Sequence, residues 1–98
     1  MQLRFRERER VNTEIVKYLS DYGVSTLADI AVSGSLLPDE VCRGVADLAR
    51  YGFIQVIGIP GLDTDTLEKS FLRPKAKIRL SRKGHVAAPT YLSSTREQ

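Results

Sequence analysis

LADIAVSGSLLPDEVCRGVADLARYGFIQV, residues 27–56, is the stretch of this chain that decides the fold. A short segment with apolar residues at helical spacing is followed by a turn of Ser and Gly and then by a second helical segment. A glycine separates the second segment from a β-rich run. This order predicts a helix-turn-helix that leads directly into a β-hairpin.

The first helix of this unit has recognisable ends. Thr26 followed by Asp29 is typical of a capping box with the shorter acid, so we place the start of the helix there. The Ser33-Gly34-Ser35 turn closes the helix. The apolar positions expected to face the core are Leu27, Ile30 and Ala31.

The second helix of the unit is equally well marked. Pro38 suits the first helical position, because its missing N–H would have no partner there. Asp39 and Glu40 follow in the first turn, where the helix dipole favours acids. Gly52 ends the helix, and the expected buried stripe consists of Val41, Val45 and Leu48.

A longer helix is predicted before this unit, over residues 7–22. Gly23 follows it and suits the left-handed conformation that ends many helices. In residues 1–6 apolar and basic side chains alternate, so this segment is an arm, an edge strand or an extension of the helix. The apolar face of the helix carries Val11, Ile15 and Leu19.

Two strands are predicted after the unit, over residues 53–59 and 75–80, and they form a hairpin with one face on the core. A long loop, residues 60–74, joins them, and Asp65 and Glu68 are candidates to cap a helical turn within it. The loop also carries apolar residues that either fold back on the core or meet another subunit, namely Leu62, Leu67, Phe71 and Leu72.

The C-terminal part predicts a last helix over residues 82–88, capped by Ser81 and interrupted or kinked by Pro89. Tyr91 and Leu92 follow and make either dimer contacts or intramolecular ones. Residues 93–98 read as a frayed tail. The length of 98 residues suits a single domain with a modest core.

Two stretches of this chain resemble a known family. VCRGVADLARYGFI (41–54) is similar to the recognition helix and first wing strand of winged helix-turn-helix regulators of the MarR/PadR/ArsR-like type. IRLSRKGHVAA (78–88) is similar to the step from their second wing strand into the last helix. The resemblance implies an α+β fold with a three-helix core, a two- to three-stranded β-wing and a C-terminal helix. It also implies a homodimeric, sequence-specific regulator of transcription that binds double-stranded DNA.

The charge distribution indicates where a nucleic acid would bind. Residues 1–72 hold eight Lys/Arg and eleven Asp/Glu, whereas residues 73–83 hold six basic side chains and no acid. Such a local positive patch attracts polyanions. An alternative is that lysines on an edge strand only prevent aggregation. The candidate phosphate contacts are Arg73, Lys75, Lys77 and Arg79.

The predicted recognition helix offers weaker candidates. Arg43 either contacts guanine or pairs with Asp39 and Asp47, four residues away on either side. Glu40 either accepts from cytosine or interacts with the helix dipole. Ser35 is a third candidate, through which this helix would enter the major groove together with Glu40 and Arg43. The excess of acids on this helix also favours an alternative function, a winged-helix module that binds another protein in a transcription or replication assembly.

Other function classes find no support in the residues. No metal-ligand spacing, phosphate-binding glycine loop or nucleophile elbow is present, so we expect neither an enzyme nor a cofactor or metal site. No apolar stretch is long enough to cross a membrane. The lone Cys42 suits a reducing cytoplasm and is either a core residue or a redox switch.

Overall fold

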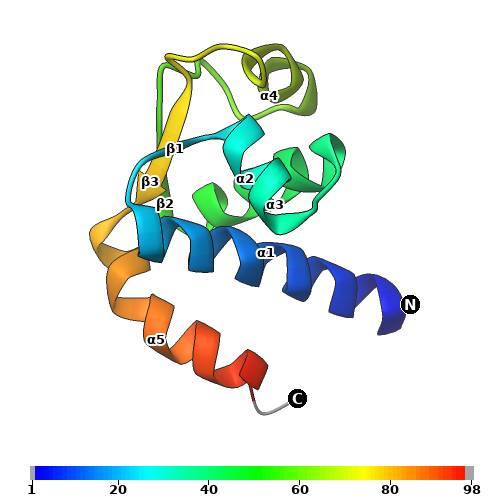
Figure 1. The fold of residues 1–98 in the computed structure, drawn as a ribbon, viewed down its shortest axis with the longest axis vertical. Coiled ribbons are helices and arrows are strands. Elements are labelled where there is room, and N and C mark those ends of the chain that lie inside the picture. Colours follow the sequence, from blue (N-terminus) through cyan, green and yellow to red (C-terminus); the bar gives the residue numbers. More distant parts are fainter. Residues whose placement is uncertain (1, 97–98) are drawn as a thin grey trace.

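The structure is a computed structural model that describes the backbone of residues 2–96 and the side chains of residues 9–92. Over this part of the chain, five helices and a three-stranded antiparallel sheet make an α+β fold, as predicted (Figure 1). The helices are α1 (Gln2–Tyr22), α2 (Leu27–Gly34), α3 (Pro38–Arg50), α4 (Thr64–Ser70) and α5 (Arg82–Arg96). The strands are β1 (Ser25–Thr26), β2 (Ile54–Ile57) and β3 (Lys77–Leu80).

The sheet has the order β1-β3-β2, so β3 is its central strand. The hairpin of β2 and β3 was predicted, and the two residues of β1 pair with the other side of β3. Edge protection concerns unpaired backbone groups, and Lys77 has a strand neighbour on both sides, so this alternative is wrong for Lys77. Arg79 pairs with β2 alone.

The helix-turn-helix signals are confirmed. The Thr26 hydroxyl accepts a hydrogen bond from the Asp29 N–H at 3.2 Å and caps α2. Ser35 closes that helix in the left-handed conformation, with φ of 52°. Pro38 begins α3, and the Glu40 carboxylate accepts from the Leu37 N–H at 2.9 Å. Val41, Val45 and Leu48 are fully buried, as expected from their spacing.

Gly44 sets the distance between α3 and α1. A Cβ atom at this position would lie 2.5 Å from Ile15 Cδ1 and 3.0 Å from Asn12 Oδ1. Glycine normally weakens a helix interior, so its presence here indicates a packing reason. The missing side chain lets α1 cross close to α3, and the two helices share the central core.

Helix α1 is longer than predicted, because it begins at Gln2 rather than near residue 7. Of the three alternatives for residues 1–6, residues 2–6 continue the helix, and Met1 lies outside the described residues. Gly23 ends α1 with φ of 83°, and its N–H donates to the Leu19 carbonyl at 2.8 Å. The predicted end of this helix is therefore confirmed.

The segment between β2 and β3 is not a plain loop. It contains α4, which packs against α3 (Figure 1). The expected caps Asp65 and Glu68 are wrong, because the Asp63 carboxylate takes this role and accepts from both the N–H and the hydroxyl of Thr66. Leu67 of α4 is fully buried, whereas Leu72, just after α4, is 88% exposed. The apolar residues of this segment thus divide between the core and the surface.

Helix α5 is also longer than predicted. Ser81 caps it as expected, since the Ser81 hydroxyl accepts from the Gly84 N–H at 3.0 Å. The helix continues through Pro89 to Arg96, so the predicted end at residue 88 is wrong. Packing along α1 supports this extra length (Figure 1). Residues 93–96 of the expected frayed tail are helical, and residues 97–98 lie outside the described residues.

Candidate functional site

The exposed face of the sheet carries the basic residues of β3. Lys77 and Arg79 point away from the core, while Ile78 and Leu80, which alternate with them, are buried. The strand register places Lys77 beside Ile57 and Thr26, and Arg79 beside Gln55. We call these five residues the outer sheet face, which comprises Thr26, Gln55, Ile57, Lys77 and Arg79.

No carboxylate neutralises the outer sheet face. None of the three strands contains an acid, and no acidic group in the described part of the chain lies within 4.0 Å of Lys77 or Arg79. Arg79 Nε donates to Gln55 Oε1 at 3.0 Å, which fixes the guanidinium over β2. The face therefore presents two uncompensated positive charges on a rigid central strand.

Arg73 and Lys75 extend this charge beyond the sheet. Both are exposed in the turn between α4 and β3, where the Ala76 N–H donates to the Arg73 carbonyl at 3.1 Å. Gly58 at the end of β2 approaches this turn closely, because a Cβ there would lie 2.6 Å from the Lys75 carbonyl oxygen. The contact holds the basic turn against the hairpin. All four candidate phosphate contacts thus belong to one continuous segment.

Helix α3 presents a second exposed surface, in which acids and bases alternate. We call it the outer stripe of α3, and it consists of Asp39, Arg43, Asp47 and Arg50. The ion pairs of Arg43 with Asp39 and Asp47 that the spacing allows do not form, since no acid in the described part of the chain lies within 4.0 Å of Arg43. Arg43 therefore points into solvent. Helices α1 and α4 pack on α3 at the sides of the stripe.

Ser35 and Glu40, the other two predicted DNA contacts near α3, differ in how accessible their side chains are. Ser35 is exposed in the turn between α2 and α3. Glu40 already caps α3, and its carboxylate also lies 3.8 Å from the Arg10 guanidinium, with the side chain only 18% exposed. Glu40 thus acts at the N-terminus of α3, which was the alternative to a contact with cytosine.

Cys42 lies on the side of α3 that faces the core. Its side chain is 1% exposed. Burial raises the pKa of the Cys42 thiol, and the carboxylates of Glu68 and Asp39 raise it further. Reactive cysteines have lowered pKa values and are accessible to solvent. These features match the core alternative for Cys42 and not the redox alternative.

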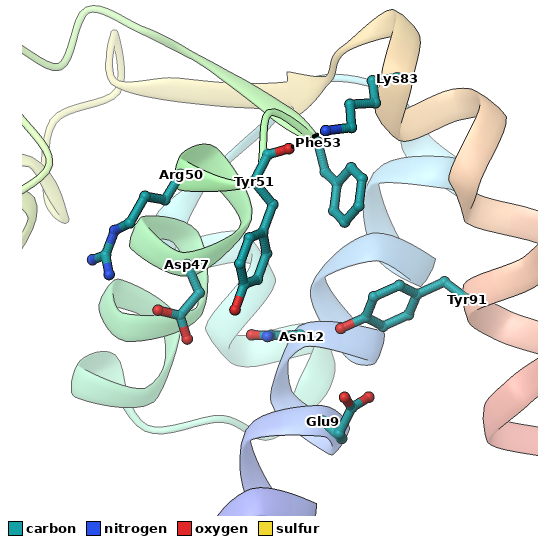
Figure 2. Close-up of a pocket in the computed structure, with 8 residues that line it drawn as sticks. All are labelled: Glu9, Asn12, Asp47, Arg50, Tyr51, Phe53, Lys83 and Tyr91. Atoms are coloured by element: carbon teal, nitrogen blue, oxygen red, sulfur yellow. Dashed lines mark hydrogen bonds between the residues drawn. The ribbon is translucent and has the colours of Figure 1, made fainter.

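A pocket that the sequence did not predict opens where α1, the end of α3 and α5 meet (Figure 2). Its volume is about 640 Å³. Tyr51 and Phe53, in the connection from α3 to β2, form one side with ring centroids 6.0 Å apart. Tyr91 of α5 forms the opposite side and Asn12 of α1 lies between them (Figure 2). Tyr91, expected at a dimer contact or in intramolecular packing, here lines an intramolecular pocket.

Charged groups surround this pocket on all sides. Lys83 Nζ donates to the Tyr51 carbonyl at 2.8 Å and lies 5.2 Å from the centre of the Phe53 ring, so its charge is held at one end. The Glu9 carboxylate lies at the opposite end, below Tyr91 (Figure 2). Asp47 lies on the α3 side (Figure 2).

Two polar groups on the pocket wall have unusual environments. Asn12 is 8% exposed, and its Oδ1 accepts no hydrogen bond from the described residues. Burial raises the pKa of the Tyr91 hydroxyl, the Glu9 carboxylate adds to this rise, and a hydrogen bond with the Asn12 side chain opposes it. Asn12 follows Val11 within an otherwise apolar stripe, and a polar residue at such a position was the signal available in the sequence.

Comparison of this chain with protein-family models, curated proteins and solved structures finds no match. The described residues contain no group of three or more His, Cys, Asp or Glu side chains placed to hold a metal ion. None of the helices, over the same residues, has the length and apolar character needed to cross a bilayer.

Proposed function

We propose that this chain is a winged-helix domain that binds double-stranded DNA as a sequence-specific, homodimeric regulator of transcription in the cytoplasm. The order of its elements supports the winged-helix assignment, since three helices precede a hairpin and a short strand between the first two completes the sheet. In this arrangement α3 enters the major groove, and the segment from β2 to β3 is the wing.

The uncompensated charge of the outer sheet face is the observation that carries the proposal. Lys77 and Arg79 have no acid within ion-pairing distance in the described part of the chain, and they lie on the central strand of the sheet. Phosphate groups supply the missing negative charge, and their neutralisation releases counterions from DNA. Arg73 and Lys75 add two further phosphate contacts from the adjoining turn.

Arg43 is the side chain we assign to base recognition. It lies on the exposed stripe of α3 without an ion-pair partner in the described part of the chain, so its guanidinium is available for a bidentate contact with guanine. Ser35 is exposed just before α3, and we assign it as a further contact in the major groove. Glu40 remains committed to its cap.

The test is a titration of duplex DNA at several salt concentrations. With four phosphate contacts, the logarithm of the association constant falls against the logarithm of salt concentration with a slope of about −3.6. The double variant Lys77→Ala/Arg79→Ala removes two of these contacts, so the slope becomes shallower by about 1.8. Fluorescence anisotropy with a labelled random duplex measures both slopes.

A matched variant separates local contacts from the effect of net charge. Lys17→Ala/Lys69→Ala also removes two charges, but Lys17 lies on α1 and Lys69 is paired with Asp65 at 3.1 Å. This variant is expected to keep the slope of the parent. Equal loss in both variants would assign binding to net charge alone, and absence of any salt-dependent binding would refute the DNA-binding proposal.

The second candidate function is a module that binds another protein. Leu62 and Leu72, on either side of α4, are exposed, and Leu72 keeps 88% of its surface in contact with solvent. Large exposed apolar side chains at one site are typical of protein interfaces. A chain that binds no duplex in the titration above, but that loses a protein contact on Leu72→Ser, would have this function.

A further inference from the structure

The turn between α4 and β3 presents a large apolar side chain to solvent. Leu72 is 88% exposed, more than any other large hydrophobic residue in the described part of the chain. Its neighbour Phe71 is partly buried and packs against the core. Helix α4, which this turn follows, lies at the opposite end of the molecule from α5 (Figure 1). Leu72 thus projects from the proposed wing.

Backbone hydrogen bonds on both sides hold Leu72 in this exposed position. The Phe71 N–H donates to the Glu68 carbonyl at 3.2 Å, and the Arg73 N–H donates to the Ser70 carbonyl at 3.1 Å. The exposure of Leu72 is therefore a property of an ordered turn. A single exposed apolar residue is common on protein surfaces, so the surrounding charges must decide whether it has a partner.

Two exposed cations follow Leu72 directly. Arg73 and Lys75 have no acid within 4.0 Å in the described part of the chain. The close approach of Gly58 to the Lys75 carbonyl holds this part of the turn against the hairpin. An apolar side chain next to fixed, unpaired cations is complementary to a surface that is negative at its rim and apolar within.

The acids at the start of α4 do not neutralise these cations. Asp65 pairs with Lys69 at 3.1 Å, one turn along the same helix. The Asp63 carboxylate accepts hydrogen bonds from the N–H and the hydroxyl of Thr66. Both carboxylates are therefore engaged within α4.

The shape of DNA limits where Leu72 can lie in the proposed complex. The major groove is about 12 Å wide and admits one helix, which is α3. Consecutive Cα atoms are about 3.8 Å apart, so a phosphate contact by Arg73 places Leu72 beside the same phosphate backbone. Beyond that backbone is the minor groove, where apolar side chains, leucine among them, insert between base steps and kink the duplex.

We propose, on the basis of the DNA-binding function above, that Leu72 is a wedge that enters the minor groove and opens a base step. Arg73 and Lys75 hold phosphates at the rim of that groove. The duplex bends by about 20–90° toward the major groove, where α3 lies. Pyrimidine–purine steps open most easily, so Leu72 determines specificity at a step that α3 does not contact.

The bend is measured by fluorescence energy transfer between dyes at the two ends of the duplex that the parent chain selects. The full chain is expected to bring the ends together, and Leu72→Ala to remove more than half of this change. Affinity falls about fivefold, the cost of one poorly matched position. The salt slope remains that of the parent, because no phosphate contact is lost. A stiff A-tract in place of the opened step is expected to weaken binding by the parent but not by Leu72→Ala.

Two further variants isolate the wedge. Val86→Ala is the matched control, since Val86 is 76% exposed on α5 and outside the proposed interface. It is expected to keep the bend and the affinity of the parent. Leu72→Met retains a large apolar side chain and is expected to keep the bend.

The possible outcomes separate the wedge from the DNA-binding function. A straight duplex with the parent chain, equal bends in the parent and Leu72→Ala, or equal loss of the bend in Val86→Ala would each overturn the wedge and leave DNA binding intact. Absence of any duplex binding would overturn both proposals. Loss of a protein contact in Leu72→Ala, with an unchanged DNA complex, would assign Leu72 to a protein interface instead.

Discussion

The outer sheet face and the outer stripe of α3 are both exposed, but their charges are arranged in opposite ways. The stripe alternates acid and base from Asp39 to Arg50, so its four charges cancel. The sheet face carries Lys77 and Arg79 with no acid on any strand. Neighbouring opposite charges cancel at a distance, whereas a net charge attracts a polyanion over about one Debye length, which is about 10 Å at 0.1 M salt. Under the proposed function, this difference assigns attraction of DNA to the sheet and close-range recognition to α3.

The difference follows from what each element does in the core. Helix α3 contacts α1, α2, α4 and β2, so most of its circumference is committed to packing and only a narrow stripe faces solvent. Strand β3 buries alternate side chains and exposes the others, so its whole outward face is available. A strand at the centre of a sheet is also held rigidly by both neighbours. It thus presents charge at fixed positions.

Reversal of charge on the sheet face is expected to have the largest effect. Lys77→Glu/Arg79→Glu removes two phosphate contacts, each worth about eightfold at 0.1 M salt, and adds repulsion, so duplex affinity falls at least about 100-fold. Fluorescence anisotropy at fixed salt measures this loss. The matched variant is Arg43→Glu/Arg50→Glu, which reverses both cations of α3. If this second variant loses more affinity, the assignment of attraction to the sheet is wrong.

Overpacking on the inner side of α3 is expected to have the next largest effect. Gly44→Val places a branched side chain where a Cβ alone would lie 2.5 Å from Ile15 Cδ1, so we expect the free energy of unfolding to fall by about 1–3 kcal/mol. Urea denaturation followed by circular dichroism gives the value. Arg43→Ala, one residue away on the exposed side, is expected to change stability by less than about 0.5 kcal/mol. Similar losses in both variants would mean that α1 and α3 do not meet at Gly44.

Substitution of Arg43 tests whether α3 recognises bases. If its guanidinium contacts a base, Arg43→Ala reduces the preference for the best site over a random duplex by about tenfold, or about 1.4 kcal/mol. The salt slope is expected to remain that of the parent, because no phosphate contact is lost. Selection of random duplexes by the parent identifies the site. A shallower slope with unchanged preference would assign Arg43 to the backbone instead.

Local signals in the sequence predicted the helix-turn-helix well. The Thr26 cap, the Pro38 start and the buried stripe of α3 each depend on residues within four positions of one another. The short strand β1 was harder to foresee, because two residues have no periodicity and pair only with the distant β3. For the same reason the sequence did not show that β3 is the central strand of the sheet. Whether a strand lies at the centre or at the edge of a sheet depends on partners that are distant in sequence, so its own residues do not reveal it.

The pocket was not predicted, because its residues come from separate elements that meet only in the tertiary structure. Glu9 and Asn12 lie some 80 residues before Tyr91 in the chain. Helix α5 was expected to end at Pro89, which placed Tyr91 outside any helix. Packing along α1 outweighs the missing N–H of this proline and carries Tyr91 to the pocket. Local propensity could not indicate this, since the deciding contacts are distant in sequence.

Removal of the Asp63 cap of α4 is expected to have the smallest effect. Helix α4 packs against α3, so the effect reaches that helix as well. Hydrogen bonds from the Thr66 hydroxyl and N–H hold the pKa of Asp63 below its usual value of 3.8. The ionised cap therefore stabilises α4 above that pH, and its contribution is lost as the pH falls through the lower folded pKa.

Hydrogen exchange of the α4 amides is expected to show less protection on Asp63→Ala at neutral pH, while α2, capped by Thr26, is unchanged. Because α4 packs on α3, the same variant is expected to speed modification of buried Cys42 by a thiol reagent severalfold. An unchanged rate, together with faster exchange in α4, would show that α4 does not protect Cys42.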